Sequence, residues 1–254
     1  MKAAGKPSLS VIWYGTPHSP FVASEEDQKA FASLDEKGRH HHGELVAMDR
    51  SIGTLRKGLR QLGIADNTLI WFTSDNGGLG GIGPDSVGGL RGKKGSVYEG
   101  GLRVPGIVEW PKGIKPRVTE HPSAVMDIFP TLVELLELPQ KSMLKLVDGV
   151  SLVPLFEGEI GRRKSPIPFQ FGKNTVLLDN NAKIIFNRTK GSYELYDLGD
   201  DPTETTNLVE KRPELASRLK KQVNALAESI AHSDTGGDYP GGKIVHAFPE
   251  RGFW

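Results

Sequence analysis

Residues 68–78 read Thr-Leu-Ile-Trp-Phe-Thr-Ser-Asp-Asn-Gly-Gly, an apolar run that ends in a carboxylate, an amide and two glycines. Residues 68–74 are rich in β-branched and aromatic side chains, which predicts a buried strand. Upstream, apolar residues recur every three or four positions, as in an amphipathic helix that ends at Gly63: Leu45, Met48, Ile52, Leu55, Leu59 and Leu62. A second strand candidate, 9–14, precedes this helix. The strand–helix–strand order predicts an α/β fold with a mainly parallel mixed sheet flanked by helices.

The rest of the chain divides into two parts. Glycine-rich residues 77–101 lack periodicity, so we expect a long loop. A loop of this length inside a compact domain is usually either functional or disordered. A strand at 104–110 and a helix at 126–138, in which Pro130 is tolerable only in the first turn, should complete a large domain over 1–156.

A change of pattern after residue 156 predicts a small α+β domain over 157–232. One apolar helical stripe at 213–231 follows four short antiparallel strand candidates: 167–171, 175–178, 183–187 and 194–197. We expect residues 233–254, rich in glycine, proline and charge, to form an extended or disordered tail.

Composition excludes several classes of protein. The chain has 254 residues with a net charge of +1, so it lacks the bulk basic character of a nucleic-acid-binding protein. The net charge does not exclude a local site for a small anion, because it averages such features away. No apolar run approaches the roughly 18 residues of a membrane span, and the N-terminus has no apolar signal region. The cysteine count of zero excludes disulfides, thiolate metal sites and a cysteine nucleophile on these residues.

Three segments carry candidate chemistry. In open α/β sheets, ligands bind beyond the carboxyl ends of strands, where Asp75 and Asn76 offer hard oxygen ligands for Ca²⁺ or Mg²⁺. Lys94, between glycines and next to Gly95-Ser96, offers an ammonium group and backbone N–H groups to a tetrahedral oxyanion. His18 follows the first strand candidate and offers a proton or a hydrogen bond to an anion.

Each segment also has a simpler interpretation. Asp-Asn-Gly-Gly is a common turn after a strand, the lysine segment is compatible with a solvated basic loop, and a histidine between prolines is often a fixed loop residue. His40, His41 and His42 are interpreted as a solvated approach to the helix rather than a metal site.

Taken together and in order, these segments resemble the sulfatase family of the alkaline phosphatase-like superfamily. The resemblance includes Met48–Gly53, Thr73–Gly77 and, most specifically, Lys94-Gly-Ser-Val-Tyr-Glu-Gly-Gly-Leu-Arg-Val-Pro105. Later landmarks of the family are matched by Asp127–Leu132, Asp148–Leu152 and Glu194–Leu198. The match runs from Leu9 to about Ala231 and corresponds to the C-terminal half of such a protein.

The resemblance implies a sulfuric ester hydrolase of the arylsulfatase type. Asp75 and Asn76 would form part of a Ca²⁺ site, with Mg²⁺ a second choice, and Lys94 and His18 would contact the sulfate of an aryl or carbohydrate sulfate ester. The family uses formylglycine, made from Cys-x-Pro-x-Arg or Ser-x-Pro-x-Arg, and neither motif occurs here. We therefore expect this chain to lack the nucleophile segment and to be inactive alone.

Two alternatives stay open. One is a phosphate or phosphonate ester hydrolase of the same superfamily, and the other is a non-catalytic fragment that binds sulfated glycans. The resemblance also implies a periplasmic or secreted parent protein. It does not indicate which ester is cleaved, or an oligomeric state.

Overall fold

The computed structural model describes residues 7–82, 86–143, 147–238 and 241. The chain divides into two compact units, residues 1–165 and 166–254, and each is described by itself. Most of the predicted tail at 233–254 lies outside the described residues. Within them, no helix is long and apolar enough to cross a membrane.

A long helix, α2 (Glu36–Gln61), organises the first unit. Asp35 caps its N-terminus by accepting a hydrogen bond from the Gly38 amide at 2.7 Å. The chain leaves the helix through Gly63, whose φ of +63° is a conformation that glycine adopts without strain. The helix thus ends where the sequence predicts but begins nine residues before the apolar stripe.

The early start of α2 corrects the interpretation of the three histidines. His40, His41 and His42 lie inside the helix, and His41 is buried. Two short helices, α1 (Glu25–Gln28) and the 3₁₀ helix η2 (Lys29–Phe31), pack against this end of α2 and exclude water from it.

The described sheet of the first unit pairs β1 (Ile70–Thr73) with β2 (Gly106–Glu109). The pair is antiparallel, with Ile70 opposite Glu109 and Thr73 opposite Gly106. No parallel pair occurs among the described strands, so the predicted parallel sheet stays a prediction. Residues 9–14 are not assigned to a strand, because a strand requires a hydrogen-bonded neighbour and none of the described residues supplies one.

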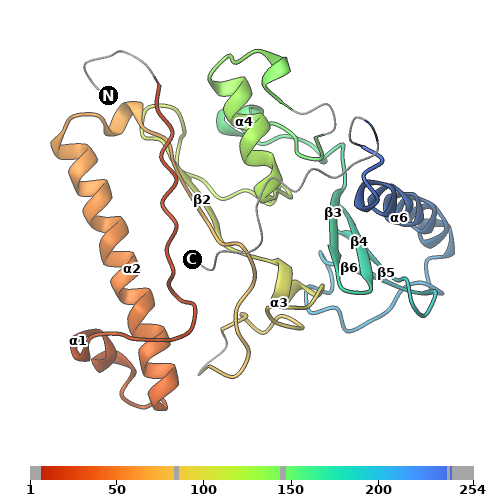
Figure 1. Ribbon diagram of the computed structural model, residues 1–254, viewed down its shortest axis with the longest axis horizontal. Helices are drawn as coiled ribbons and strands as arrows, with labels where there is room; N and C mark the ends of the chain where they lie inside the picture. The colour runs from red at the N-terminus through yellow and green to blue at the C-terminus, as the bar shows by residue number, and fades with distance from the viewer. Residues whose placement is uncertain (1–6, 83–85, 144–146, 239–240, 242–254) are drawn as a thin grey trace. The chain divides into compact units, whose positions relative to one another are not determined.

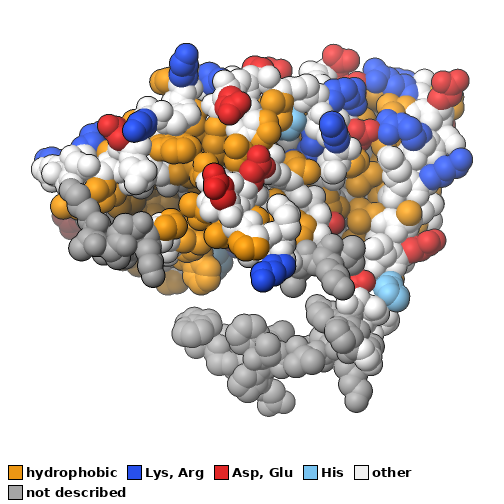
Figure 2. Space-filling view, turned by 90° about the horizontal axis from the view of Figure 1, so that it is seen from above, with side chains coloured by type: hydrophobic (Ala, Val, Ile, Leu, Met, Phe, Trp, Pro, Cys, Tyr) orange, Lys and Arg blue, Asp and Glu red, His pale blue; other side chains and the backbone are white. Residues whose placement is uncertain are grey.

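The N-terminal arm, residues 7–23, runs along α2 (Figure 1). Its apolar side chains are exposed, with Leu9 at 70% and Trp13 at 92% of full exposure. Figure 2 shows hydrophobic side chains (orange) at the surface over much of the face that it displays. A β-rich apolar run that is exposed in this way is a surface suited to association.

A small core packs against the β1–β2 sheet. Leu152, Leu155 and Phe156, in and next to α5 (Val153–Glu157), contact partly buried side chains of both strands. The Phe156 ring meets the Trp71 ring at 6.5 Å in an edge-on arrangement.

The remaining elements of the first unit are short. The helix α4 (Ile128–Leu135) begins two residues later than predicted, which places Pro130 in its first turn, where its missing N–H costs nothing. The others are η3 (Ala65–Asn67), α3 (Glu99–Leu102), η4 (Val125–Asp127) and η5 (Gln140–Ser142).

The second unit confirms the predicted antiparallel sheet with one helix. Its strands pair in chain order, and α6 (Pro213–Asp234) covers them: β3 (Ile167–Phe171), β4 (Asn174–Asp179), β5 (Ala182–Asn187) and β6 (Ser192–Asp197). Leu219 and Val223 of α6 are fully buried against Ile184 and Leu195 of the sheet. The apolar stripe of the helix therefore forms this core.

Candidate functional site

Asp75 and Asn76 follow directly after β1. The Ser74 hydroxyl donates to the Asn76 carbonyl oxygen at 3.1 Å, which closes a tight turn at the end of the strand. Asn76 Nδ2 donates to the Gly77 carbonyl oxygen at 3.1 Å. Asn76 Oδ1 has no hydrogen bond within the described part of the chain, and Asp75 is exposed. Two hard oxygen groups are thus open to a divalent cation.

The Asp75 loop (residues 74–82) and the Lys94 loop (residues 91–101) are joined through their backbones. The Gly77 amide donates to the Gly101 carbonyl oxygen at 2.9 Å, and the Lys94 amide donates to the Gly78 carbonyl oxygen at 2.8 Å. These two bonds bring together the two loops that carry the predicted metal ligands and the predicted sulfate-binding lysine.

Glycine permits this close approach. A Cβ atom on Gly77 would collide with the Gly100 carbonyl oxygen, so any larger residue would force the loops apart. Gly95 adopts a φ of +85°, a conformation that other L-residues rarely adopt, and it turns the chain immediately after Lys94. The glycine content of this region is therefore a requirement of backbone packing.

The two adjacent lysines have different surroundings. Lys94 is partly buried, whereas Lys93 is exposed and its aliphatic stem lies next to Gly80. The Lys93 amide donates to Ser96 Oγ at 3.2 Å, and the Ser96 amide donates to the Lys93 carbonyl oxygen at 3.0 Å. This turn fixes the backbone that carries Lys94.

His18 is exposed in the N-terminal arm, and its own loop holds it. Its amide donates to the Gly15 carbonyl oxygen, and its Nδ1 lies 2.9 Å from the Ser19 carbonyl oxygen. A carbonyl oxygen can only accept, so Nδ1 carries a proton and Nε2 is the atom open to a ligand. Within the described part of the chain, no hydrogen bond or ion pair connects His18 to the Asp75 loop or the Lys94 loop.

Sequence reasoning missed a group of residues that holds these loops. Glu44 and His40 of α2 accept hydrogen bonds from the Val22 and Ala23 amides, just after His18. His42 contacts the Ile82 carbonyl oxygen in the Asp75 loop. The spacing of His40 and Glu44, four positions apart on one helical face, is a signal that could have identified them.

Burial sets the charge state of the neighbouring histidine. It lowers the pKa of the His41 imidazole below its ordinary value of 6.5; His42 lowers the pKa further, whereas Glu44 raises it. The His41 ring packs edge-on against Phe21 at 5.1 Å. His41 therefore favours the neutral form in a partly apolar environment.

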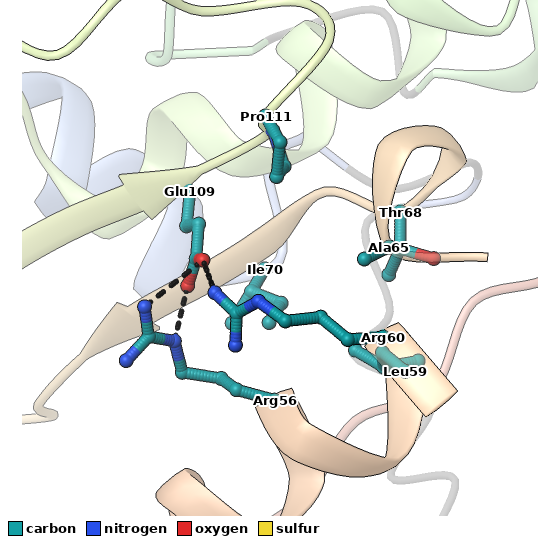
Figure 3. Close-up of a pocket in the computed structure, with 8 residues that line it drawn as sticks. All are labelled: Arg56, Leu59, Arg60, Ala65, Thr68, Ile70, Glu109 and Pro111. Carbon is teal, nitrogen blue, oxygen red and sulfur yellow. Dashed lines mark hydrogen bonds and ion pairs between the residues drawn. The ribbon is translucent and has the colours of Figure 1, made fainter. Parts of the chain in front are cut away.

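A recess of about 10 Å³ lies at the other end of α2, and it contains none of the predicted site residues (Figure 3). Arg56 binds Glu109 of β2 through two hydrogen bonds of 2.6 and 3.0 Å, and Arg60 adds a third of 2.9 Å. The hydrogen bond from Arg56 lowers the pKa of the Glu109 carboxyl group and raises that of Arg56 itself. The recess has room for about one water molecule, and we interpret the ion pairs beside it as a brace between α2 and β2.

The described residues contain no group of three or more histidine, cysteine, aspartate or glutamate side chains that could hold a metal ion. Asp75 and Asn76 fit a cation in the chemistry of their donors. They supply fewer oxygens than the 6–8 that Ca²⁺ typically takes, so by themselves they would not complete its coordination.

Comparison with known proteins identifies the family. The sequence model named Sulfatase matches residues 1–138, more than half of the chain. The chain belongs to the sulfatase family. A second sulfatase model, "N-sulphoglucosamine sulphohydrolase, C-terminal", matches residues 92–229.

Individual sulfatases match the chain over part of their length. Steryl-sulfatase of Mus musculus is 37% identical over 155 residues, which cover 56% of this chain and 24% of that protein. A sulfatase of Formosa agariphila is 31% identical over 242 residues, which cover 81% of this chain and 43% of that protein. The chain thus spans less than half the length of these relatives.

Solved structures agree in fold. The crystal structure of Ps i-CgsB superposes with a TM-score of 0.73 at 27% identity, covering 84% of this chain and 48% of that one. A structure of BT4656 with D-glucosamine-2-N,6-O-disulfate has a TM-score of 0.57 at 25% identity, covering 79% of this chain and 42% of that one. The fold is therefore that of part of a sulfatase, which is alkaline phosphatase-like.

Proposed function

We propose that this chain forms part of a sulfatase catalytic domain that hydrolyses sulfate esters. The observation that carries the proposal is the pair of backbone hydrogen bonds between the Asp75 and Lys94 loops. They join a segment with two hard oxygen donors to a segment with a partly buried lysine. Cation ligands combined with a lysine suit the binding of a tetrahedral oxyanion, because preorganised positive charge stabilises the charge that develops on it.

Each predicted residue then has a role. Asp75 and Asn76 would hold a divalent cation, Ca²⁺ in preference to Mg²⁺, and the cation would offset charge on the sulfate. Lys94 would donate a charge-assisted hydrogen bond to a sulfate oxygen. His18, in the imidazolium form with both ring nitrogens protonated, would use Nε2–H to stabilise or protonate the leaving oxygen. Because two residues supply few ligands, calorimetry of the chain with Ca²⁺ should show weak binding, and tight stoichiometric binding would contradict this ligand assignment.

The nucleophile would come from outside these 254 residues. The chain contains no cysteine and no Ser-x-Pro-x-Arg sequence, so formylglycine cannot form on it. Binding and electrostatics alone leave no group to attack sulfur. We therefore expect the purified chain with Ca²⁺ to release no phenol from a chromogenic aryl sulfate.

Carbohydrate sulfates are the substrate class that we favour over aryl sulfates. The second sulfatase model takes its name from an enzyme of N-sulphoglucosamine. One structure of Ps i-CgsB contains k-i-k-neocarrahexaose, and the BT4656 structure contains a disulfated glucosamine. The similarity to these proteins supports a sulfated sugar as the substrate here.

The test is turnover by the chain joined to the preceding half of a sulfatase catalytic domain that carries Cys-x-Pro-x-Arg. We expect hydrolysis of glucosamine 6-sulfate or an aryl sulfate, and no comparable hydrolysis of the matching phosphate esters. Preference for the phosphate esters would support the phosphohydrolase alternative. Binding of sulfated glycan without turnover would support the non-catalytic one.

A further inference from the structure

The segment His40–Glu44 of α2 is unusually polar for its degree of burial. His41 is 5% and Glu44 8% exposed, and His41 Nδ1 and Glu44 Oε2 have no hydrogen-bond partner among the described residues. Gly43 lets the N-terminal arm approach closely, since a Cβ atom at this position would lie 2.7 Å from Ala23 Cβ. Leaving buried polar atoms unpaired is costly, so packing for stability alone does not account for this composition.

On one side, this segment holds the arm that carries His18. Glu44 Oε1 accepts from the Val22 amide at 2.7 Å, and His40 Nδ1 accepts from the Ala23 amide at 3.0 Å. On the N-terminal side of His18, the Tyr14 hydroxyl lies 3.0 Å from Ser51 Oγ of the same helix. The loop that carries His18 is therefore anchored to α2 at both ends.

On the other side, the segment holds the Asp75 loop. His42 Nε2 lies 3.2 Å from the carbonyl oxygen of the buried Ile82, and the His42 ring stacks on Phe31 at 5.1 Å. Gly78, four residues before Ile82, accepts the backbone hydrogen bond from Lys94. A short series of contacts thus leads from α2 to the backbone of Lys94.

We infer that His40, His42 and Glu44 are positioning residues that hold His18 and Lys94 in a fixed relation through one rigid helix. The inference rests on the proposed function, in which both residues contact the same sulfate. His18 has no direct bond to the Lys94 loop within the described residues, so α2 supplies the connection between them. A helix suits this purpose because its backbone is rigid and two neighbouring positions on it can contact different loops.

The hydrogen-bond partners also assign the protonation of the two rings. An amide can only donate, so His40 Nδ1 is the unprotonated nitrogen and Nε2 carries the proton. A carbonyl oxygen can only accept, so His42 also carries a proton on Nε2. Nitrogen NMR of the imidazole rings should show an unprotonated Nδ1 for His40 and a protonated Nε2 for both residues.

The test uses the chain joined to the preceding half of a sulfatase catalytic domain, with Ca²⁺ present and inorganic sulfate as the probe. In the wild type we expect the NMR signals of the His18 ring and of Lys94 to shift with one midpoint as sulfate is added. Glu44→Ala should accelerate exchange of the Val22 amide by about tenfold or more, because a hydrogen bond to a charged acceptor is lost. It should also abolish most of the sulfate-dependent shift of His18 while leaving that of Lys94.

Further variants separate positioning from stability. Glu44→Gln retains an acceptor oxygen, so it should restore both the slow exchange of the Val22 amide and the sulfate-dependent shift of His18. Asp49→Ala removes an exposed acidic residue of the same helix and should change neither measurement. His42→Phe keeps the ring stacked on Phe31 but removes the donor, so it should weaken the response of Lys94 and spare that of His18.

The possible results separate the proposed function from the positioning role of α2. A wild-type joined domain in which sulfate shifts neither signal would contradict the proposed function, whatever the exchange data show. A wild-type response to sulfate that survives Glu44→Ala and His42→Phe unchanged would overturn the positioning role. Variants that lower the melting temperature but leave the response to sulfate unchanged would also overturn the positioning role.

Discussion

Arg163 and Asp127 form an ion pair from which water is excluded. The guanidinium donates two parallel hydrogen bonds of 2.8 Å to the two carboxylate oxygens, and neither side chain is exposed. Asp127 also accepts from the Ala124 and Val150 amides at 2.8 Å each. One carboxylate therefore connects the start of α4 with two segments that lie 23 and 36 positions further along the chain.

The first prediction follows from this pair. Arg163→Met should destabilise the first unit by about 3–5 kcal/mol, because it leaves the Asp127 carboxylate buried without its countercharge. The measurement is chemical denaturation followed by circular dichroism. Glu159→Ala is the control: it removes an exposed partner of Arg117 in the same unit and should cost at most about 1 kcal/mol. Similar losses for both variants would contradict the burial of the Asp127 pair.

The second prediction compares the two adjacent lysines in the joined catalytic domain. Lys94→Ala should lower kcat/KM for an aryl sulfate by roughly one to two decades, since a charge-assisted hydrogen bond contributes about 1.5–3 kcal/mol and about 1.4 kcal/mol is a tenfold change in rate. Lys93→Ala removes an exposed charge, typically worth about 0.5 kcal/mol or less. Melting temperatures exclude unfolding as the cause. A larger loss at Lys93 would reverse the assignment of the sulfate-binding lysine.

The third prediction concerns the exposed apolar arm. Light scattering should show that the isolated chain associates as its concentration rises, and Trp13→Lys should reduce this association, because it places a charge in the middle of an unpaired β-rich run. Val118 is equally exposed, at 93%, but lies outside the arm. Val118→Lys should therefore have a smaller effect. A chain that stays monomeric at every concentration would argue against this surface.

The fourth prediction is a dependence of stability on pH. Burial lowers the pKa of His41, so just below pH 6.5 the unfolded chain binds more protons at this position than the folded chain does. The contribution of neutral His41 to stability is fully present above pH 6.5, and it is lost as the pH falls toward the lower pKa of the folded state. His41→Gln should flatten the fall in the free energy of unfolding between about pH 7 and pH 5. If the free energy of unfolding of the variant falls with pH as steeply as that of the wild type, His41 is not shielded from protonation.

The sequence by itself determined the local elements and the positions of the candidate chemistry. Periodicity encodes a helix or a strand through neighbouring residues, so the stripe of α6 and the four strands before it were predictable. Asp75 and Asn76 at the end of β1, and Lys94 between glycines, were likewise apparent from order alone. Their assignment to a cation and a sulfate came from the resemblance to sulfatases and stays a proposal.

Only the tertiary structure decided which distant residues meet. Nothing local to Asp127 indicates that Arg163 is its partner, and nothing local to Glu44 indicates that it accepts from the Val22 amide. Such contacts depend on how whole elements pack, and a buried polar group is stable only where packing supplies its partner. The same reason explains the misread histidines: the local sequence around them is polar, and Phe21 of the N-terminal arm and Phe31 of η2 pack against His41 and His42 from outside the helix. Strand pairing is also non-local, so the sequence predicted β1 and β2 but not their antiparallel register.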